Sequence, residues 1–183
     1  MTKNPMLDQL SGVVPMEAAY AFLKYTKKGM AQRLVHQLKY GGSKKVGVIL
    51  GRWFAKDIQQ KVLEQGFDCI MPVPIHRSRL MKRGYNQSLE IAIGMSEVLG
   101  IPVETNAIKR VHMTQSQAKK MRLDRLTNFH VEYVVWDVSK IDGRKILLID
   151  DVITTGATIT SVCSLLTDYG VKSLSVGCLA TGK

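Results

Sequence analysis

The apolar positions in the first third of the chain change from alternation to helical spacing. Residues 1–12 show no period and predict a loose lead-in, while residues 18–25 alternate weakly and predict an extended segment. Residues 30–40 carry an apolar residue at every fourth position and end at a glycine pair, so they predict a helix. A second helix is predicted to end at Gly66. Its expected apolar stripe is Val46, Ile49, Leu50, Trp53, Phe54, Ile58 and Val62.

After residue 68, short apolar runs alternate with helical stretches. Residues 69–73 predict a strand, and a basic loop then leads into a helix that ends at Gly100. The expected apolar face of that helix is Tyr85, Leu89, Ala92, Ile93 and Leu99. Weaker strands are predicted at residues 101–103, 107–108 and 131–136. The alternation itself favours a parallel sheet over an antiparallel one.

The clearest strand signal lies near the end of the chain. Residues 145–149 form a continuous apolar run that predicts a central parallel strand, covered on both faces and ending at the acidic pair that follows. A helix ending at Gly170 and a last strand at residues 174–180 complete the pattern. We therefore expect an α/β fold, with a mainly parallel twisted sheet flanked by helices, in which residues 13–183 form a single domain.

The charge of the chain favours an anionic partner. Its 26 lysines and arginines outnumber its 15 acidic residues, giving a net charge of +11. Such a surface suits nucleic acid, a phosphate-rich small molecule or an acidic protein. The basic residues gather in two clusters, at 76–83 and 109–125, which a solvated surface would also explain.

The cysteine pattern and the apolar runs exclude other classes of protein. The three cysteines lie far apart in apolar surroundings, so they predict buried small side chains rather than a disulfide framework or a zinc ribbon. No apolar run approaches the ~20 residues of a membrane span, and no start typical of a signal peptide is present. We therefore expect a cytoplasmic protein without membrane insertion.

The acidic pair Asp150 and Asp151 is followed by a turn rich in threonine and glycine. In an open parallel sheet, ligands bind beyond the carboxyl ends of the strands, where this segment lies. The start of the next helix offers N–H groups to a phosphate, and the two carboxylates would accept hydrogen bonds from sugar hydroxyls, near a Mg²⁺ ion. The pattern thus favours a ribose phosphate, although an ordinary strand-to-helix loop capped by threonine would look similar.

The whole string ILLIDDVITTGAT resembles the phosphoribosyl-pyrophosphate (PRPP) signature of type I phosphoribosyltransferases. The chain lacks the glycine-rich patterns of nucleotide-triphosphate loops and dinucleotide folds. The segments MPVPIH and KRGYNQ are similar to those of ComF-like, competence-associated members of this superfamily. Further matches are Leu38, Lys39, Tyr40, Gly41, Gly42, Thr114, Gln115, Gln117, Arg122, Arg125 and Asn128. The resemblance covers nearly all of residues 13–183 and implies a type I phosphoribosyltransferase-like fold.

The resemblance also implies a role for each segment of the site. The residues expected to bind the ribose and its 5-phosphate are Asp150, Asp151, Val152, Thr154, Thr155, Gly156, Ala157 and Thr158. Those expected at the pyrophosphate are Pro74, Ile75, His76, Arg79, Lys82 and Arg83. Residues 109–125 would form a flap from which Lys119 or Arg122 reaches the pyrophosphate. The implied catalytic set is Asp150, Asp151, His76, Lys119 and Arg122. His76 would either transfer a proton or fix its loop as an N–H donor.

The implied reaction is Mg²⁺-dependent transfer of phosphoribosyl from PRPP to an acceptor, with release of pyrophosphate, in a protein connected with DNA uptake. No residue identifies the acceptor. The chain has neither a glutaminase half nor a leading cysteine, so we do not expect it to make phosphoribosylamine from glutamine. The protein would alternatively be a non-catalytic PRPP sensor, or an accessory protein that binds single-stranded DNA or DNA-uptake proteins. An unrelated α/β module is a third reading.

The sequence departs from the family pattern in one respect, and it does not define the oligomeric state. Relatives usually begin with a four-cysteine zinc ribbon, which is missing here. We expect truncation of a longer protein rather than loss of the module in this lineage. The oligomeric state is open, with a homodimer as one candidate.

Overall fold

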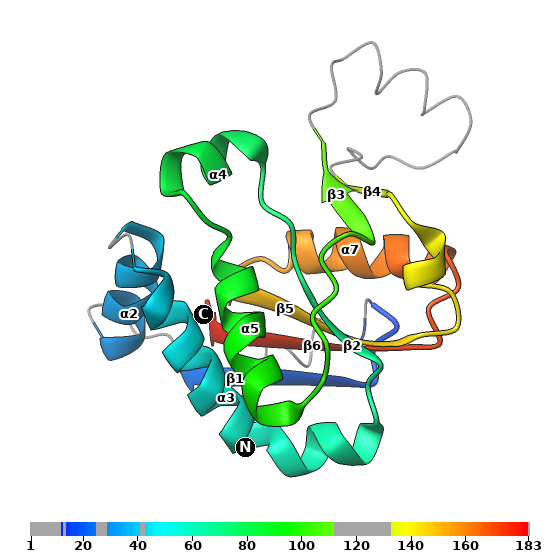
Figure 1. The fold of residues 1–183 in the computed structure, drawn as a ribbon, viewed down its shortest axis with the longest axis horizontal. Helices are drawn as coiled ribbons and strands as arrows, with labels where there is room; N and C mark the ends of the chain where they lie inside the picture. The colour runs from blue at the N-terminus through cyan, green and yellow to red at the C-terminus, as the bar shows by residue number, and fades with distance from the viewer. Residues whose placement is uncertain (1–11, 13, 25–28, 41–42, 112–132, 183) are drawn as a thin grey trace.

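A computed structural model describes residues 12, 14–24, 29–40, 43–111 and 133–182 of the chain. Its main sheet has four parallel strands in the order β1-β6-β5-β2 (Figure 1). They are β1 (Ala18–Lys24), β6 (Ser173–Thr181), β5 (Lys145–Ile153) and β2 (Cys69–Pro72). This confirms the predicted α/β fold with a parallel sheet flanked by helices. The predicted lead-in lies almost wholly outside the described residues.

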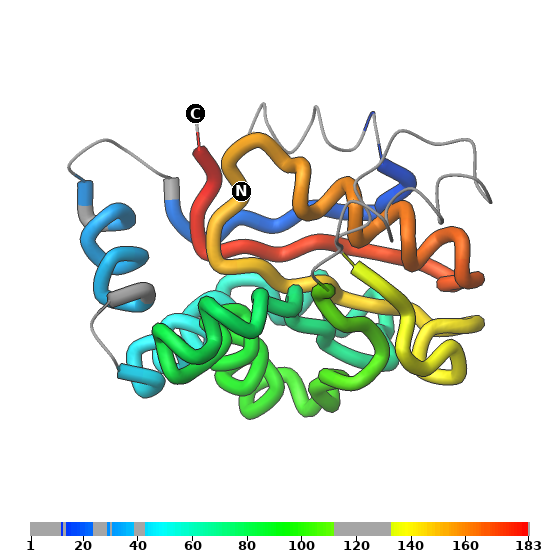
Figure 2. Tube along the Cα trace, turned by 90° about the horizontal axis from the view of Figure 1, so that it is seen from above, coloured from blue at the N-terminus to red at the C-terminus, as the bar shows by residue number. Residues whose placement is uncertain are grey.

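Helices cover both faces of this sheet (Figure 2). On one face lie α3 (Lys44–Gln65) and α5 (Gln87–Leu99), and on the other lies α7 (Ala157–Asp168). The side chains of β5 alternate between the two cores: Ile146 and Leu148 belong to the α7 side, and Leu147 and Ile149 to the α3 and α5 side. All four are fully buried, as expected of a central parallel strand. A further helix, α2 (Met30–Tyr40), adds Leu38 to the second core.

The contact between α3 and α5 depends on glycine. A Cβ atom at Gly51 would overlap the carbonyl oxygen of Ile91, and one at Gly94 would overlap that of Val48. The two helix backbones therefore approach more closely than larger residues would allow. Because α3 faces α5 at this contact, its buried face differs from the predicted apolar stripe. Ile49 and Trp53 are exposed to solvent, and Trp53 is 56% exposed. The prediction was wrong at these two positions.

The central strand is longer than predicted. It was expected to end at Asp150 and Asp151, but β5 continues through both to Ile153. The reason is that β6 still pairs with β5 up to Thr181, whereas β2 ends at Pro72 opposite Ile149. The last residues of β5 are therefore paired on one side only. On the other side they border the loop that follows β2.

That loop contains a helix that was not predicted, α4 (Arg77–Arg83). Gly84, with φ of 79°, ends it. The next helix then begins at Gln87, so Tyr85 lies before α5 rather than on its apolar face. The core side of α5 is formed by Ile91, Ala92, Met95 and Leu99, while the expected Leu89 and Ile93 are only half-buried. The face was therefore predicted only in part.

The remaining elements stand beside the sheet. The weak strands expected at residues 107–108 and 131–136 form a separate antiparallel ribbon, β3 (Ile108–Arg110) and β4 (Tyr133–Val135). Residues 101–103 contribute only an isolated bridge between Val103 and Ile70. A short 3₁₀ helix, η1 (Val138–Lys140), follows β4. None of the helices in the described ranges is long and apolar enough to cross a bilayer.

The cysteines lie in the core, as predicted. All three are buried and unpaired. Burial raises the pKa of the Cys69 thiol to about 11 and that of Cys163 to about 12, and it also raises the pKa of Cys178. These thiols therefore behave as small apolar side chains.

Candidate functional site

A cavity of about 210 Å³ opens where β2 and β5 end. It is mostly polar, and three parts of the chain line it. The loop after β2 with α4 and the start of α5 contributes Val73, Pro74, Ile75, Arg79, Arg83, Gln87 and Ser88. The end of β5 and the following turn and helix contribute Asp150, Asp151, Val152, Thr154 and Thr158. The β3–β4 ribbon contributes Arg110 and Tyr133.

Hydrogen bonds orient the acidic pair at this cavity. One oxygen of Asp150, Oδ1, accepts from the Ser88 hydroxyl at 3.1 Å and from the Asp151 backbone N–H at 2.8 Å. The Oδ1 atom of Asp151 accepts from the Val152 N–H at 2.7 Å. Both side chains are half-buried rather than solvated. They are therefore held in fixed positions at the end of the central strand, where they can accept hydrogen bonds from a ligand.

The Thr/Gly turn joins β5 to α7 beside these carboxylates. Gly156 has φ of 79°, a left-handed conformation that favours glycine, and lets the chain turn sharply into the helix. The first N–H groups of α7 and the positive end of its dipole favour an anion here. Thr154 and Thr158 line the cavity. The Thr155 hydroxyl instead accepts from the Ala157 N–H at 3.4 Å.

The loop after β2 forms the opposite wall. Its backbone is tied down because the Val73 N–H donates to the Ile149 carbonyl at 2.9 Å and Asn86 Nδ2 donates to the Val73 carbonyl at 3.0 Å. The side chain of Asn86 also caps α5 by accepting from the Ser88 N–H. Pro74 and Ile75 thus stand at a fixed place between the end of β2 and the start of α5.

Three guanidinium groups surround the cavity. Arg79 and Arg83 come from successive turns of α4, and Arg83 donates to Gln87 Oε1 at 3.1 Å. Arg110 lies 5.4 Å from the centre of the Tyr133 ring, at the ends of the two ribbon strands. Gln87 is 1% exposed, and its Nε2 has no hydrogen-bond partner among the described residues. The cavity therefore combines donors for an anion with carboxylates that accept hydrogen bonds.

His76 stands apart from the cavity lining. Its Nδ1 accepts from the Ser78 N–H at 3.1 Å and lies 2.7 Å from the Ser78 hydroxyl, so the ring caps α4. Nδ1 thus helps to fix the loop as an acceptor, and the N–H donor role of the ring stays a prediction. A proton-transfer role for His76 stays a prediction.

The structure brings together most of the predicted site. Nine predicted residues line the cavity: Pro74, Ile75, Arg79, Arg83, Asp150, Asp151, Val152, Thr154 and Thr158. Five predicted residues that the structure describes are not in that lining: His76, Lys82, Thr155, Gly156 and Ala157. Lys119 and Arg122 lie outside the described residues. The roles of all these residues remain predictions.

Four polar lining residues were not predicted as site residues: Gln87, Ser88, Arg110 and Tyr133. Gln87 ends the KRGYNQ segment and Ser88 follows it, so that segment was the available signal. Arg110 belongs to the second basic cluster, and Tyr133 has no comparable signal in the sequence.

The donor set fits magnesium only together with a ligand. The described part of the chain holds no group of three or more histidine, cysteine or acidic side chains suited to bind a metal ion alone. Two neighbouring carboxylates are nevertheless typical of Mg²⁺ sites in which substrate phosphates and water supply the other oxygens. The residues present therefore fit an ion that arrives with a phosphorylated ligand.

Comparison with known proteins relates this geometry to a family. A model described as "Phosphoribosyl transferase domain" matches residues 86–183, which include the acidic pair, the Thr/Gly turn and all of α7. The matched region begins at Asn86 and so also contains Gln87 and Ser88. It covers more than half of the chain.

Two curated relatives support the predicted resemblance to competence-associated proteins. Competence protein F of Haemophilus influenzae is 35% identical over 114 residues, which are 62% of this chain and 50% of that protein. The DNA utilization protein YhgH of Salmonella typhi is 30% identical over 153 residues, which are 80% of this chain and 65% of that protein. The chain thus spans half of the length of one relative and 65% of the other.

Solved structures agree on the fold. The glutamine PRPP amidotransferase from B. subtilis superposes with a TM-score of 0.53 at 15% sequence identity, over 79% of this chain and 30% of that one. At this identity the likeness shows a shared fold only.

Proposed function

The chain belongs to the phosphoribosyl transferase domain family, and from that premise we propose that it binds PRPP in the cavity at the ends of β2 and β5. There it transfers the phosphoribosyl group to an acceptor and releases pyrophosphate. One observation carries the proposal: the acidic pair on β5, the Thr/Gly turn and the loop after β2 all face the same cavity.

Each part of PRPP has complementary groups in this arrangement. The carboxylates of Asp150 and Asp151 accept hydrogen bonds from the ribose hydroxyls. Thr154 and Thr158, with the first N–H groups of α7, hold the 5-phosphate. The pyrophosphate lies against Pro74 and Ile75, where two guanidinium groups from α4 offset its negative charge. This orientation places the anionic ends of PRPP at N–H, hydroxyl and guanidinium donors, and its hydroxyls at the carboxylates.

In the proposed reaction, the bond between the anomeric carbon and the pyrophosphate oxygen breaks, and a bond from that carbon to the acceptor forms. The electron pair of the broken bond leaves with pyrophosphate, so negative charge grows there. Arg79 and Arg83 stabilise that charge. Mg²⁺ bound with PRPP near Asp150 and Asp151 would supply further neutralisation of the phosphates. Lys119, Arg122 and His76 remain proposed contributors.

The similarity to a competence protein and to DNA utilization proteins supports a role in DNA uptake. We further propose that the protein acts in the cytoplasm. The same names and the net charge of +11 favour a second candidate function, in which the chain senses PRPP or binds single-stranded DNA without catalysis. The DNA-binding form of that candidate requires an affinity for single-stranded DNA that falls steeply as salt rises, because each neutralised phosphate releases counterions. An affinity that does not respond to salt contradicts it.

A thermal-shift titration with PRPP and Mg²⁺ tests the proposed site. Ligand at 100 times its dissociation constant adds about 2.7 kcal/mol to the free energy of unfolding. At about 2–4 °C per kcal/mol for a chain of this size, the melting temperature should rise by roughly 5–10 °C.

The double variant Asp150→Asn with Asp151→Asn should lose this rise. The matched control is Asp57→Asn with Asp168→Asn, which removes two exposed carboxylates from α3 and α7 and should keep it. A rise of equal size in the Asp150 and Asp151 variant contradicts the assignment of the site.

A further inference from the structure

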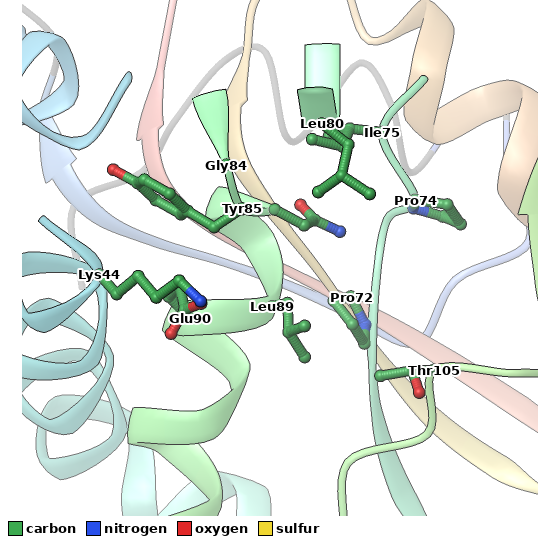
Figure 3. A pocket seen from close by; sticks show the side chains of 11 residues that line it. Lys44, Pro72, Pro74, Ile75, Leu80, Gly84, Tyr85, Leu89, Glu90 and Thr105 are labelled. Carbon is green, nitrogen blue, oxygen red and sulfur yellow. The ribbon is translucent and has the colours of Figure 1, made fainter. Parts of the chain in front are cut away.

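A second cavity adjoins the first at the loop after β2, and Figure 3 shows the side chains that line it. Its volume is about 360 Å³, and its walls are mainly apolar. The described residues that line it are Lys44, Pro72, Pro74, Ile75, Leu80, Gly84, Tyr85, Asn86, Leu89, Glu90 and Thr105. Only Pro74 and Ile75 belong to both cavities. The proposed PRPP site therefore makes no use of the rest of this lining.

The size and the walls of this second cavity define the body of a ligand. Ligand pockets usually measure about 300–1,000 Å³, so this one suits a small molecule of one or two rings. Pro72, Leu80 and Leu89 offer apolar surface, and Figure 3 shows them around a common space with Pro74 and Tyr85. A flat aromatic body fits such a lining because burial of apolar surface drives its binding.

One carboxyl group defines the polar end of that ligand. Glu90 is 7% exposed, and besides burial the influence found on its carboxyl group within the described part of the chain is the charge of Lys44. It is buried because α5 lies directly on Gly47 of α3, where an added Cβ would come within 2.6 Å of the Glu90 Cβ. A buried carboxyl group that faces a cavity is strongly stabilised by a donor, above all a charged one.

The positive charge of Lys44 offsets the burial of this carboxyl group only in part. Burial raises the pKa of Glu90, and the opposing effect of the Lys44 ammonium is the smaller one. Lys44 is exposed to solvent, which screens its charge, although Figure 3 shows its ammonium on the Glu90 side of the cavity. A cation placed deeper in the cavity interacts with Glu90 more strongly than Lys44 does.

From these observations we propose that the second cavity is a separate binding site for a small aromatic amine or amidine, whose cationic or N–H group donates to Glu90. Since Pro74 and Ile75 line both cavities, filling this site also alters the affinity for PRPP. The binding site itself is independent of the proposed function, and only this coupling rests on it.

Benzamidine is the probe for the binding site, with benzoate as an anion of the same ring. Titration of the ¹⁵N-labelled full chain, followed by NMR, should shift the backbone resonances of Leu89, Glu90 and Thr105 with benzamidine and not with benzoate. Glu90→Gln keeps the shape of the side chain and should weaken benzamidine binding by about tenfold or more. Lys44→Gln removes the competing cation and should strengthen it.

Three results would overturn the binding site. They are the absence of benzamidine binding, equal affinity in the wild type and Glu90→Gln, and shifts confined to the cavity of Asp150 and Asp151. PRPP is absent from this titration, so its outcome is separate from that of the proposed function. For the coupling, saturating benzamidine should change the dissociation constant of PRPP by about fivefold or more. A change within twofold, with benzamidine bound, refutes the coupling alone.

Discussion

Replacement of Gly94 by alanine sets two opposing effects against each other. In a helix open to solvent, this change adds about 1 kcal/mol to stability because alanine favours the helix. In this structure, however, the new Cβ would overlap the Val48 carbonyl oxygen and come within 3.0 Å of the Arg52 backbone nitrogen. Because these are backbone atoms of α3, no side-chain rotation relieves the overlap. The two helices must separate.

The expected net result is a loss of stability. Overpacking of a buried contact costs about 1–3 kcal/mol, and backbone neighbours place Gly94→Ala at the upper end of that range. After the gain in helix propensity is subtracted, about 1–2 kcal/mol of the free energy of unfolding should be lost. Urea denaturation followed by circular dichroism measures this loss, since the midpoint falls while the slope stays constant.

The control is Ser164→Ala, an exposed position on α7 that should change stability by no more than about 0.5 kcal/mol. If Gly94→Ala instead stabilises the protein by about 1 kcal/mol, as at an exposed position, the close approach of α3 and α5 is refuted. The packing of α5 on α3 also positions Ser88 at the first cavity and Glu90 at the second, so both proposals depend on it.

Two further outcomes are expected. Ser88→Ala removes the hydroxyl that donates to Asp150, while the Asp150 carboxylate keeps its hydrogen bond from the Asp151 N–H. Calorimetry should therefore show that PRPP binds about tenfold more weakly, a loss of ~1.4 kcal/mol in binding free energy. Unchanged affinity would mean that the hydrogen bond from Ser88 does not position the carboxylate. The buried thiols with raised pKa, among them Cys69 and Cys163, should not react with DTNB at pH 8 in the folded protein and should react fully in urea. Rapid reaction in native buffer would contradict their burial.

The sequence predicted best those parts of the fold that local pattern controls. The continuous apolar run in β5 predicted a central strand, because apolar side chains on both faces of a strand must be buried under other elements. Its end at Ile153 was not predictable, since it depends on how far β6 continues beside it. The same holds for Trp53, whose exposure follows from the glycine contact between α3 and α5 rather than from the period of α3 itself.

Short elements and tertiary neighbours escaped prediction. The helix α4 spans only seven residues and is capped by His76, which is not among the usual capping residues. Ser88 reaches Asp150 across 62 positions of sequence, so only the packing of α5 beside β5 brings the two together. In contrast, Asp150, Asp151, Thr154 and Thr158 form one local string, and that string was sufficient to locate the cavity.

The central claim is that one cavity holds the ribose, the 5-phosphate and the pyrophosphate of PRPP together. Calorimetric titrations of PRPP, ribose 5-phosphate and pyrophosphate, each with Mg²⁺, test it most directly. The claim predicts that PRPP binds at one site per chain, more tightly than either fragment, and that each fragment competes with it. Fragments that bind without displacing PRPP, or PRPP that binds no more tightly than ribose 5-phosphate, would contradict it.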